Sequence, residues 1–260
     1  SQEIQRYAAN AYKTAGLSAN EYMETVTGFS ASLIQSLGGD TEKAAKYADM
    51  AITDMSDNAN KMGTDMSSIQ NAYQGFAKQN YTMLDNLKLG YGGTKQEMER
   101  LLADAEKISG VKYDISSYAD VVEAIHVMQE SMDIAGTTAK EAEATISGSV
   151  NALKSAVSNL IVGFGDADAD MELLCNNMVD AFKTVVANIT PVIENIVAAL
   201  PTALDALLTA VGELLPTLLE AVTELFSQVL ETLLSLLPQL IPAAVSALMT
   251  IVDTLIENLP

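Results

Sequence analysis

Residues 232 to 252 read TLLSLLPQLIPAAVSALMTIV and carry no ionisable side chain. This run of 21 residues is close to the roughly 20 that cross the hydrocarbon core of a bilayer as a helix. Pro238 and Pro242 lie inside it, and each removes a backbone donor, so a single straight helix is not expected. The segment must be shielded from water inside a membrane, an oligomer or a sheath of other chains.

The residues before this run combine an acidic stripe with an apolar face. Glu213, Glu220, Glu224 and Glu231 are spaced by seven, four and seven residues, which places them on one narrow stripe of a helix. The other side carries the predicted membrane or oligomer face, which consists of Leu218, Val222, Leu225, Phe226, Val229 and Leu233. We therefore predict that residues 191 to 260 form apolar, acidic-striped, proline-broken helices that self-associate, with a possible membrane segment at 232 to 252.

The charge of the chain restricts its partners. The net charge is −20, from 34 acidic and 14 basic residues. Thirteen of the basic residues lie at or before Lys154, and only Lys183 follows. Nucleic-acid binding depends on a basic surface that displaces counterions, so direct binding to DNA or RNA is not expected. Adsorption to an anionic lipid surface is disfavoured for the same reason.

The ends of the chain and its cysteine content add two expectations. The chain begins with Ser1 and stops at Pro260 within an apolar pattern, so we expect it to be a fragment of a longer protein. The basic and apolar pattern of a signal peptide is not seen at its start. Cys175 is the single cysteine, which excludes an internal disulfide framework and a zinc cluster. We expect it to be a small, buried apolar residue.

Helix start and stop signals fill residues 1 to 165, which we predict to be a region of short amphipathic helices. Ser18 and Glu21 form a capping box, and the helix that follows should end at Gly38-Gly39. Asp40 caps a second helix that Gly63 closes. Further helices are expected at 65 to 79, after a capping box at Thr94, and after Ser116 or Ser117.

A third capping box, Thr138 to Glu141, should open the longest apolar seam of the chain. Its members recur at near-heptad steps and are Ala142, Ile146, Val150, Leu153, Val157 and Leu160. Gly163-Phe164-Gly165 should end this helix, and a linking helix should occupy the segment 166 to 190. Across the whole region, the residues predicted to be substantially buried are Val26, Phe29, Leu33, Val122, Ile125 and Leu153.

Three stretches resemble functional sites only superficially. The glycine-rich segment Gly90 to Lys95 has Thr before Lys, the reverse of a phosphate-binding loop, and fits a helix connector better. Asp166, Asp168 and Asp170 have the spacing that opens a calcium loop, but the later positions of such a loop are not matched. His126 is the sole histidine and is predicted to be structural. We therefore predict no catalytic residue, metal or cofactor.

Three segments, in order, resemble the tail tape measure proteins of long-tailed phages and prophages of Gram-positive, Firmicutes-like hosts. They are FSASLIQSLGG at Phe29 to Gly39 with AAKYADMA following, LDNLKLGYGGTKQEMERLLA at Leu84 to Ala103, and Ala144 to Gly165 with SGSVNALK and LIVGFG. The resemblance covers residues 1 to 165. The apolar tract behind it is typical of that family by composition only.

The resemblance implies a scaffold rather than an enzyme. Several copies of a helical protein would lie in the lumen of the phage tail, and tube subunits would polymerise around them until the length is matched. Expected partners are further copies, the tail tube, distal tail or baseplate proteins, and the host membrane on ejection, when the apolar part would help DNA to cross. Two alternatives stay open: a membrane-active, pore-forming helical protein and a fragment of a tail-associated peptidoglycan hydrolase.

Overall fold

The computed structural model describes residues 2 to 257, and every regular element in that range is helical. This confirms the predicted all-α fold class. The elements are α1 (Gln2–Thr14), α2 (Ala19–Thr27), α3 (Ser30–Ser36), α4 (Thr41–Met62), α5 (Met66–Phe76), the 3-10 helix η1 (Leu84–Leu87), α6 (Lys95–Ser109), α7 (Tyr118–Ser131), α8 (Thr137–Ala144), α9 (Ile146–Gly163) and α10 (Met171–Glu257).

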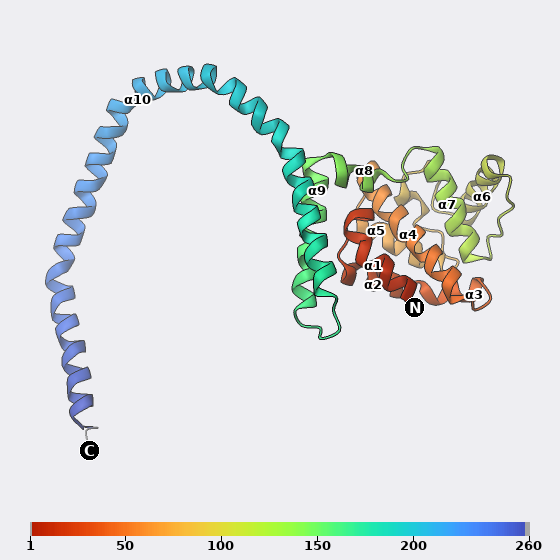
Figure 1. Cartoon of the computed structure of the whole chain (residues 1–260), viewed down its shortest axis with the longest axis horizontal. Coiled ribbons are helices and arrows are strands. Elements are labelled where there is room, and N and C mark those ends of the chain that lie inside the picture. The colour runs from red at the N-terminus through yellow and green to blue at the C-terminus, as the bar shows by residue number, and fades with distance from the viewer. Residues whose placement is uncertain (1, 258–260) are drawn as a thin grey trace. The chain divides into compact units, whose positions relative to one another are not determined.

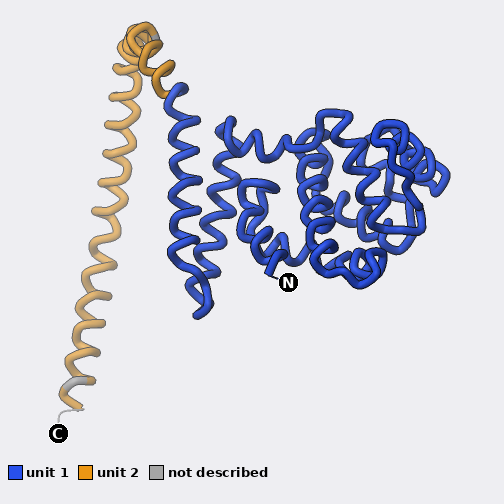
Figure 2. Tube along the Cα trace, turned by 45° about the vertical axis from the view of Figure 1, so that its right-hand side comes forward, with its two compact units in different colours: residues 1–192 blue, residues 193–260 orange. Residues whose placement is uncertain are grey.

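The chain divides into two compact units, Ser1–Val192 and Ile193–Pro260, called unit 1 and unit 2 below (Figure 2). Unit 1 contains α1 to α9 and the first part of α10, and unit 2 contains the rest of α10. All large buried side chains lie in unit 1, whereas the described apolar side chains of unit 2 are exposed.

Helix α4 is the centre of unit 1. It contacts α1, α3, α5, α7 and α8, and Figure 1 shows α6 and α7 on one side of it and α9 on the other. Ala48, Ala51, Ile52 and Met55 are at most 2% exposed and form its buried face. Because alanines make up half of this face, neighbouring helices approach α4 closely, and the larger of the two core clusters extends from α1 to α7.

The ends of α4 follow the predicted capping chemistry. Asp40 lies just before the helix, and its carboxylate accepts hydrogen bonds from the backbone N–H groups of Glu42 at 3.1 Å and Lys43 at 2.9 Å. Gly63 ends the helix with a φ of 62°, a left-handed conformation that glycine adopts without steric cost. Both predicted boundaries of this helix are confirmed.

The single helix predicted from Ser18 to Gly38 is two helices in the structure. The capping box of Ser18 and Glu21 is confirmed, since both reciprocal hydrogen bonds are present. The chain then turns at Gly28, where a Cβ atom would lie only 2.5 Å from the side-chain nitrogen of Gln74. This turn directs Phe29 into the core, edge-on to the ring of Tyr118 at a centroid distance of 6.2 Å.

The predicted capping box at Thr138 and the continuous seam behind it are wrong. Helix α8 begins at Thr137, two residues before the start at Ala139 that a cap at Thr138 implies, and Gly136 occupies its N-cap position. Thr145 then ends α8 and caps α9 through its hydroxyl, so Ala142 and Ile146 lie on different helices.

The new start of α9 changes which of its side chains are buried. Its buried face is small and partly polar, with Ser149, Ala152, Ser155, Ala156, Asn159 and Leu160. Leu153 is therefore only half-buried and Ile146 is exposed. The other five side chains predicted to be buried, those of Val26, Phe29, Leu33, Val122 and Ile125, are buried.

The helices predicted between the prolines of residues 191 to 257 are joined in α10. Pro191, Pro201, Pro216, Pro238 and Pro242 all lie within this helix. A proline removes one N–H and displaces the carbonyl four residues earlier, which a local bend can absorb without ending the helix. The path of α10 within unit 2 is accordingly curved (Figure 1).

Candidate functional site

The predicted membrane or oligomer face lies entirely on α10 in unit 2. Its six side chains are 49% to 69% exposed, with Val229 the least and Phe226 the most exposed. At about 100° per residue they fall within about 100° of arc around the helix. A face of this size and exposure exceeds the scattered apolar residues of an ordinary surface, and such patches mark interaction or membrane-binding sites.

The acidic stripe runs along the opposite side of the same helix. Glu213, Glu220, Glu224 and Glu231 are exposed, and by helical geometry they lie within about 20° of a common line. The centre of the apolar face is about 170° away from that line. The carboxylates can therefore stay in water or line a polar lumen while the apolar face is covered.

Two stretches of α10 are long and apolar enough to cross a membrane by length and composition. They are Met171–Thr202 and Leu204–Thr254, and the second contains the uncharged run 232 to 252. The most apolar window of the second stretch has no buried residue. These two stretches allow membrane association of α10.

Unit 1 contains a buried polar network that joins α4 to α7. Asp54 is 1% exposed, and its two carboxylate oxygens lie 2.9 and 3.0 Å from Nδ1 of His126. Gln129 donates to the backbone carbonyl of Asp54 at 3.0 Å and accepts from Asn58 at 2.8 Å. Asn58 also donates to the carbonyl of Leu87 at 2.9 Å, which fixes the end of η1. The prediction that His126 is structural fits these contacts.

Asp57 is the residue that orders the start of α8. Its buried carboxylate accepts hydrogen bonds from the backbone N–H groups of Gly136 at 2.6 Å and Thr138 at 2.8 Å. These donors would otherwise lack a partner at the helix start, and a carboxylate there also complements the helix dipole. Asp57 therefore caps the start of α8 through a tertiary contact, a role that the sequence pattern assigned to Thr138.

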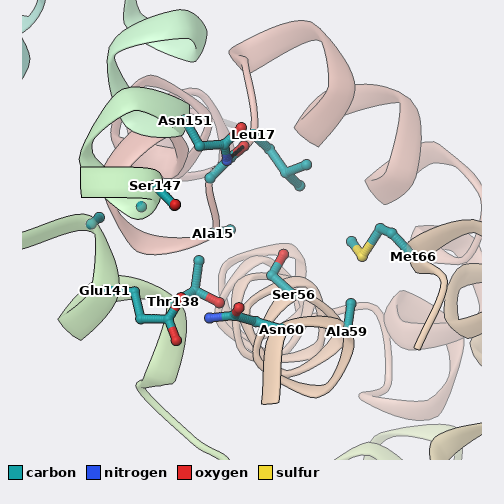
Figure 3. Close-up of a pocket in the computed structure, with 13 residues that line it drawn as sticks. Ala15, Leu17, Ser56, Ala59, Asn60, Met66, Thr138, Glu141, Ser147 and Asn151 are labelled. Carbon is teal, nitrogen blue, oxygen red and sulfur yellow. Dashed lines mark hydrogen bonds between the residues drawn. The ribbon is translucent and has the colours of Figure 1, made fainter. Parts of the chain in front are cut away.

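Next to Asp57, unit 1 has a cavity of about 330 Å³ between the α1–α2 turn, α4, α8 and the start of α9 (Figure 3). Apolar side chains of Ala15, Leu17 and Met66 line one part, and polar side chains another. The buried hydroxyl oxygens of Ser56 and Thr138 line this cavity and have no hydrogen-bond partner among the described residues. Buried polar atoms usually have partners, so these two hydroxyls are a local cost to stability.

We expect Ser56→Ala to leave the free energy of unfolding unchanged or to raise it by up to about 1 kcal/mol, because it removes an unsatisfied hydroxyl. Ser155 is the matched control: it is also 7% exposed, but its hydroxyl donates to the carbonyl of Gly16 at 3.1 Å. Ser155→Ala should therefore lower stability by about 1 kcal/mol. Urea denaturation of both variants tests this difference. An equal decrease in the free energy of unfolding of the two variants would contradict it.

The remaining predicted sites have structural roles in the described residues. Glu97 accepts from the N–H of Gly92 at 2.9 Å, and Arg100 donates to the carbonyl of Gly90 at 2.8 Å, so the glycine-rich segment is fastened to the start of α6. Only half of the predicted capping box is seen there: Thr94 caps Glu97, while the carboxylate of Glu97 binds Gly92 instead of the N–H of Thr94.

The acidic repeat and the cysteine lie at the start of α10. Asp170 caps this helix through the N–H of Leu173 at 2.9 Å, and Asp166 accepts from the N–H of Asp168 at 3.0 Å. Within residues 2 to 257, no three His, Cys, Asp or Glu side chains are grouped so that they could hold a metal ion. Cys175 is exposed, so the prediction that it is buried is wrong. The start of α10 leaves this side of the helix uncovered.

Sequence reasoning missed Asp57, Asn58 and Gln129, which carry the polar contacts of unit 1. A usable signal was present for one of them. Asn58 comes three residues after Met55 and seven after Ala51, so it continues the apolar face of α4, and polar residues at helix positions that face a core usually have partners there. Asp57 lies on the other side of the helix by the same geometry.

Comparisons of the chain with protein-family models, with curated proteins and with solved structures found no match.

Proposed function

We propose that the chain is part of a tail tape measure protein of a long-tailed phage or prophage. The observation that carries the proposal is the 87-residue helix α10, whose apolar face in unit 2 is exposed along its length. A scaffold built from several copies supplies the cover that this face needs, and the order of the three resembling segments in unit 1 supports the same family. The proposed location is the lumen of the tail, with tube and distal tail or baseplate proteins as partners.

The proposed role is mechanical and needs no catalytic site. In a tail, helices of several copies would lie side by side, and the helix rise of about 1.5 Å per residue relates chain length to tube length. On ejection, the stretch Leu204–Thr254 would leave the sheath of its partners and enter the host membrane, where prolines are tolerated when neighbouring helices satisfy the freed carbonyls.

A tail-length measurement tests this role. An in-frame deletion of residues 211 to 243 removes 33 residues of α10, so tails assembled with the shortened protein should be about 50 Å shorter in electron micrographs. Substitution of Glu220 and Glu224 by Gln in the full-length protein is the control and should leave the length unchanged. Tails of unchanged length after the deletion would contradict a ruler function for this segment.

A second candidate function is a membrane-active or pore-forming helical protein. The two apolar stretches of α10 favour it, because they would suit a bilayer whether or not the protein belongs to a phage. The two functions differ in where the protein is found: a tape measure copurifies with assembled tails, whereas a pore-former acts on liposomes without any tail protein.

A further inference from the structure

The cavity beside Asp57 in unit 1 is lined by one face of α4 and one face of α8. Residues at positions i, i+3 and i+4 share a side of a helix. On α4 the residues with this spacing that line the cavity are Ser56, Ala59 and Asn60, and on α8 they are Thr138, Glu141 and Ala142. Two helix faces thus meet at one space of about 330 Å³, and in Figure 3 the side chain of Ser56 extends from α4 toward it.

Hydrogen bonds outside the cavity hold its walls in place. The carboxylate of Asp57 fixes the start of α8 through two backbone N–H groups. The carbonyl of Gly16 accepts hydrogen bonds from the side chains of Asn151 and Ser155, each at 3.1 Å, which ties the α1–α2 turn to α9. The cavity is therefore already formed in the free chain, and a ligand that enters it does not have to order the walls.

Three polar groups of the lining are unused by the rest of unit 1. The hydroxyls of Ser56, which is 7% exposed, and of Thr138 have no hydrogen-bond partner among residues 2 to 257. Over the same range the carboxylate of Glu141 forms neither a hydrogen bond nor a salt bridge, although its backbone carbonyl accepts from Thr145. The lining residues include no Lys, Arg or His that could neutralise this carboxylate. Two free hydroxyls near a free carboxylate are suited to bind a hydroxyl group and a protonated amine.

The remaining lining limits the size of a ligand and favours an alkyl group in it. Ala15, Leu17 and Met66 contribute apolar side chains, which would be covered by a short hydrocarbon chain. The volume of about 330 Å³ is at the lower end of the roughly 300–1,000 Å³ of small-molecule sites. Asn60 and Ser147 also line the cavity and are exposed, so it is open to solvent on that side. A small, partly apolar molecule can therefore enter.

We propose that this cavity binds a small amino alcohol, an aliphatic chain with an amine and a hydroxyl group on neighbouring carbon atoms. The protonated amine donates to the carboxylate of Glu141, and the hydroxyl group exchanges hydrogen bonds with Thr138 and Ser56. Thr138 and Glu141 are three residues apart on α8, where Cβ atoms are about 5–6 Å apart, so both groups of such a ligand reach a partner. The alkyl chain packs against Leu17 and Met66. This site lies in unit 1 and is independent of the proposed function of α10.

Isothermal titration calorimetry of the full chain near neutral pH tests the proposal. The probes are 2-aminohexan-1-ol, which carries both groups, hexane-1,2-diol, which has no amine, and 2-hydroxyhexanoate, which has a carboxylate instead. The amino alcohol should bind at one site per chain with a dissociation constant in the millimolar range, as expected for a ligand of this size. The diol should bind about tenfold more weakly, because it lacks the charged hydrogen bond to Glu141, and 2-hydroxyhexanoate should not bind.

Three variants identify the groups that bind the probe. Glu141→Gln should weaken binding of 2-aminohexan-1-ol about tenfold and leave binding of the diol unchanged. Glu143→Gln is the matched control, since Glu143 is an exposed acid of the same helix outside the cavity, and it should bind both probes like the original chain. Ser56→Ala, whose stability should be unchanged or higher, should bind both probes several-fold more weakly.

Several results would overturn the proposal. No heat of binding with 2-aminohexan-1-ol, at concentrations well above the millimolar range, would mean that the cavity holds water alone. Equal affinities of the original chain and Glu141→Gln for the amino alcohol would exclude the contact between amine and carboxylate. Equal weakening by Glu141→Gln and Glu143→Gln would show that the net charge of α8, rather than a group in the cavity, attracts the amine.

Discussion

Replacement of His126 by leucine is expected to lower the free energy of unfolding of unit 1 by about 3 kcal/mol, because it removes the one side-chain donor that the buried Asp54 carboxylate has within the described part of the chain. Asp54 is 1% exposed, and both of its oxygens lie within 3.0 Å of Nδ1 of His126. The nearest acids, Asp57 and Glu130, carry the same charge and cannot compensate. Leucine fills much of the space of the imidazole, so the loss is mainly electrostatic.

The same pair should make unit 1 more stable at acid than at alkaline pH. Burial raises the pKa of the Asp54 carboxyl from its ordinary 3.8 to about 6. The hydrogen bond from Asp54 raises the pKa of His126 above its ordinary 6.5. Both groups thus hold their protons more tightly in the folded chain, so the folded state loses relative stability as the pH rises from about 4 to 6 and then through the raised pKa of His126.

Urea denaturation followed through tyrosine circular dichroism measures both effects, since all nine tyrosines precede residue 119 and report on unit 1 alone. Asp54→Asn is the matched control: it keeps an acceptor for His126 and removes the buried charge. The free energy of unfolding of this variant should stay within about 1 kcal/mol of that of the original protein, and its stability should no longer show the pH dependence that comes from Asp54. A His126→Leu variant with unchanged stability would show that the pair does not hold α4 to α7.

Replacement of Val229 by glutamate in the apolar face should weaken self-association of the chain by about 100-fold or more. The new carboxylate would either be buried without a partner or keep the two helices apart, at a cost of about 3 kcal/mol. Release of a trapped dye from liposomes should fall with it, because the same face is needed for insertion.

Gln228→Glu is the control for this change. It adds the same charge one residue away, at about 60° from the acidic stripe and about 110° from the centre of the apolar face. It should therefore leave both association and dye release close to their original values. Equal effects of the two substitutions would mean that total charge, rather than the position of the face, governs the behaviour of unit 2.

Local signals in the sequence predicted the helix starts that depend on neighbouring residues. Ser18, Asp40 and Ser117 cap their helices because each side chain reaches an N–H two or three residues ahead. Thr138 has the same local pattern as Ser18 but does not cap α8. The carboxylate of Asp57, 81 residues earlier in the chain, takes the N–H of Thr138 instead. A contact between residues this far apart in the sequence cannot be recognised from a local capping pattern.

The apolar face of unit 2 could be predicted from the sequence, whereas several side-chain contacts of unit 1 could not. On α10 the apolar face follows from helical periodicity alone, so its six residues could be identified without any tertiary contact. The burial of Cys175 and Leu153 depends on which neighbours cover each helix, and both predictions departed from the structure for that reason. In unit 1 the partners of Asp54 and Asp57 are 72 or more residues away and could not be paired by spacing.

The central claim is that unit 2 covers its apolar face with further copies of the chain, and sedimentation equilibrium of the 260-residue protein in dilute buffer tests it most directly. A chain truncated after Val192, which retains unit 1, is the comparison. The full chain should have the mass of an assembly of two or more copies, and the truncated chain the mass of one. A full-length chain that is a stable, soluble monomer would contradict the claim.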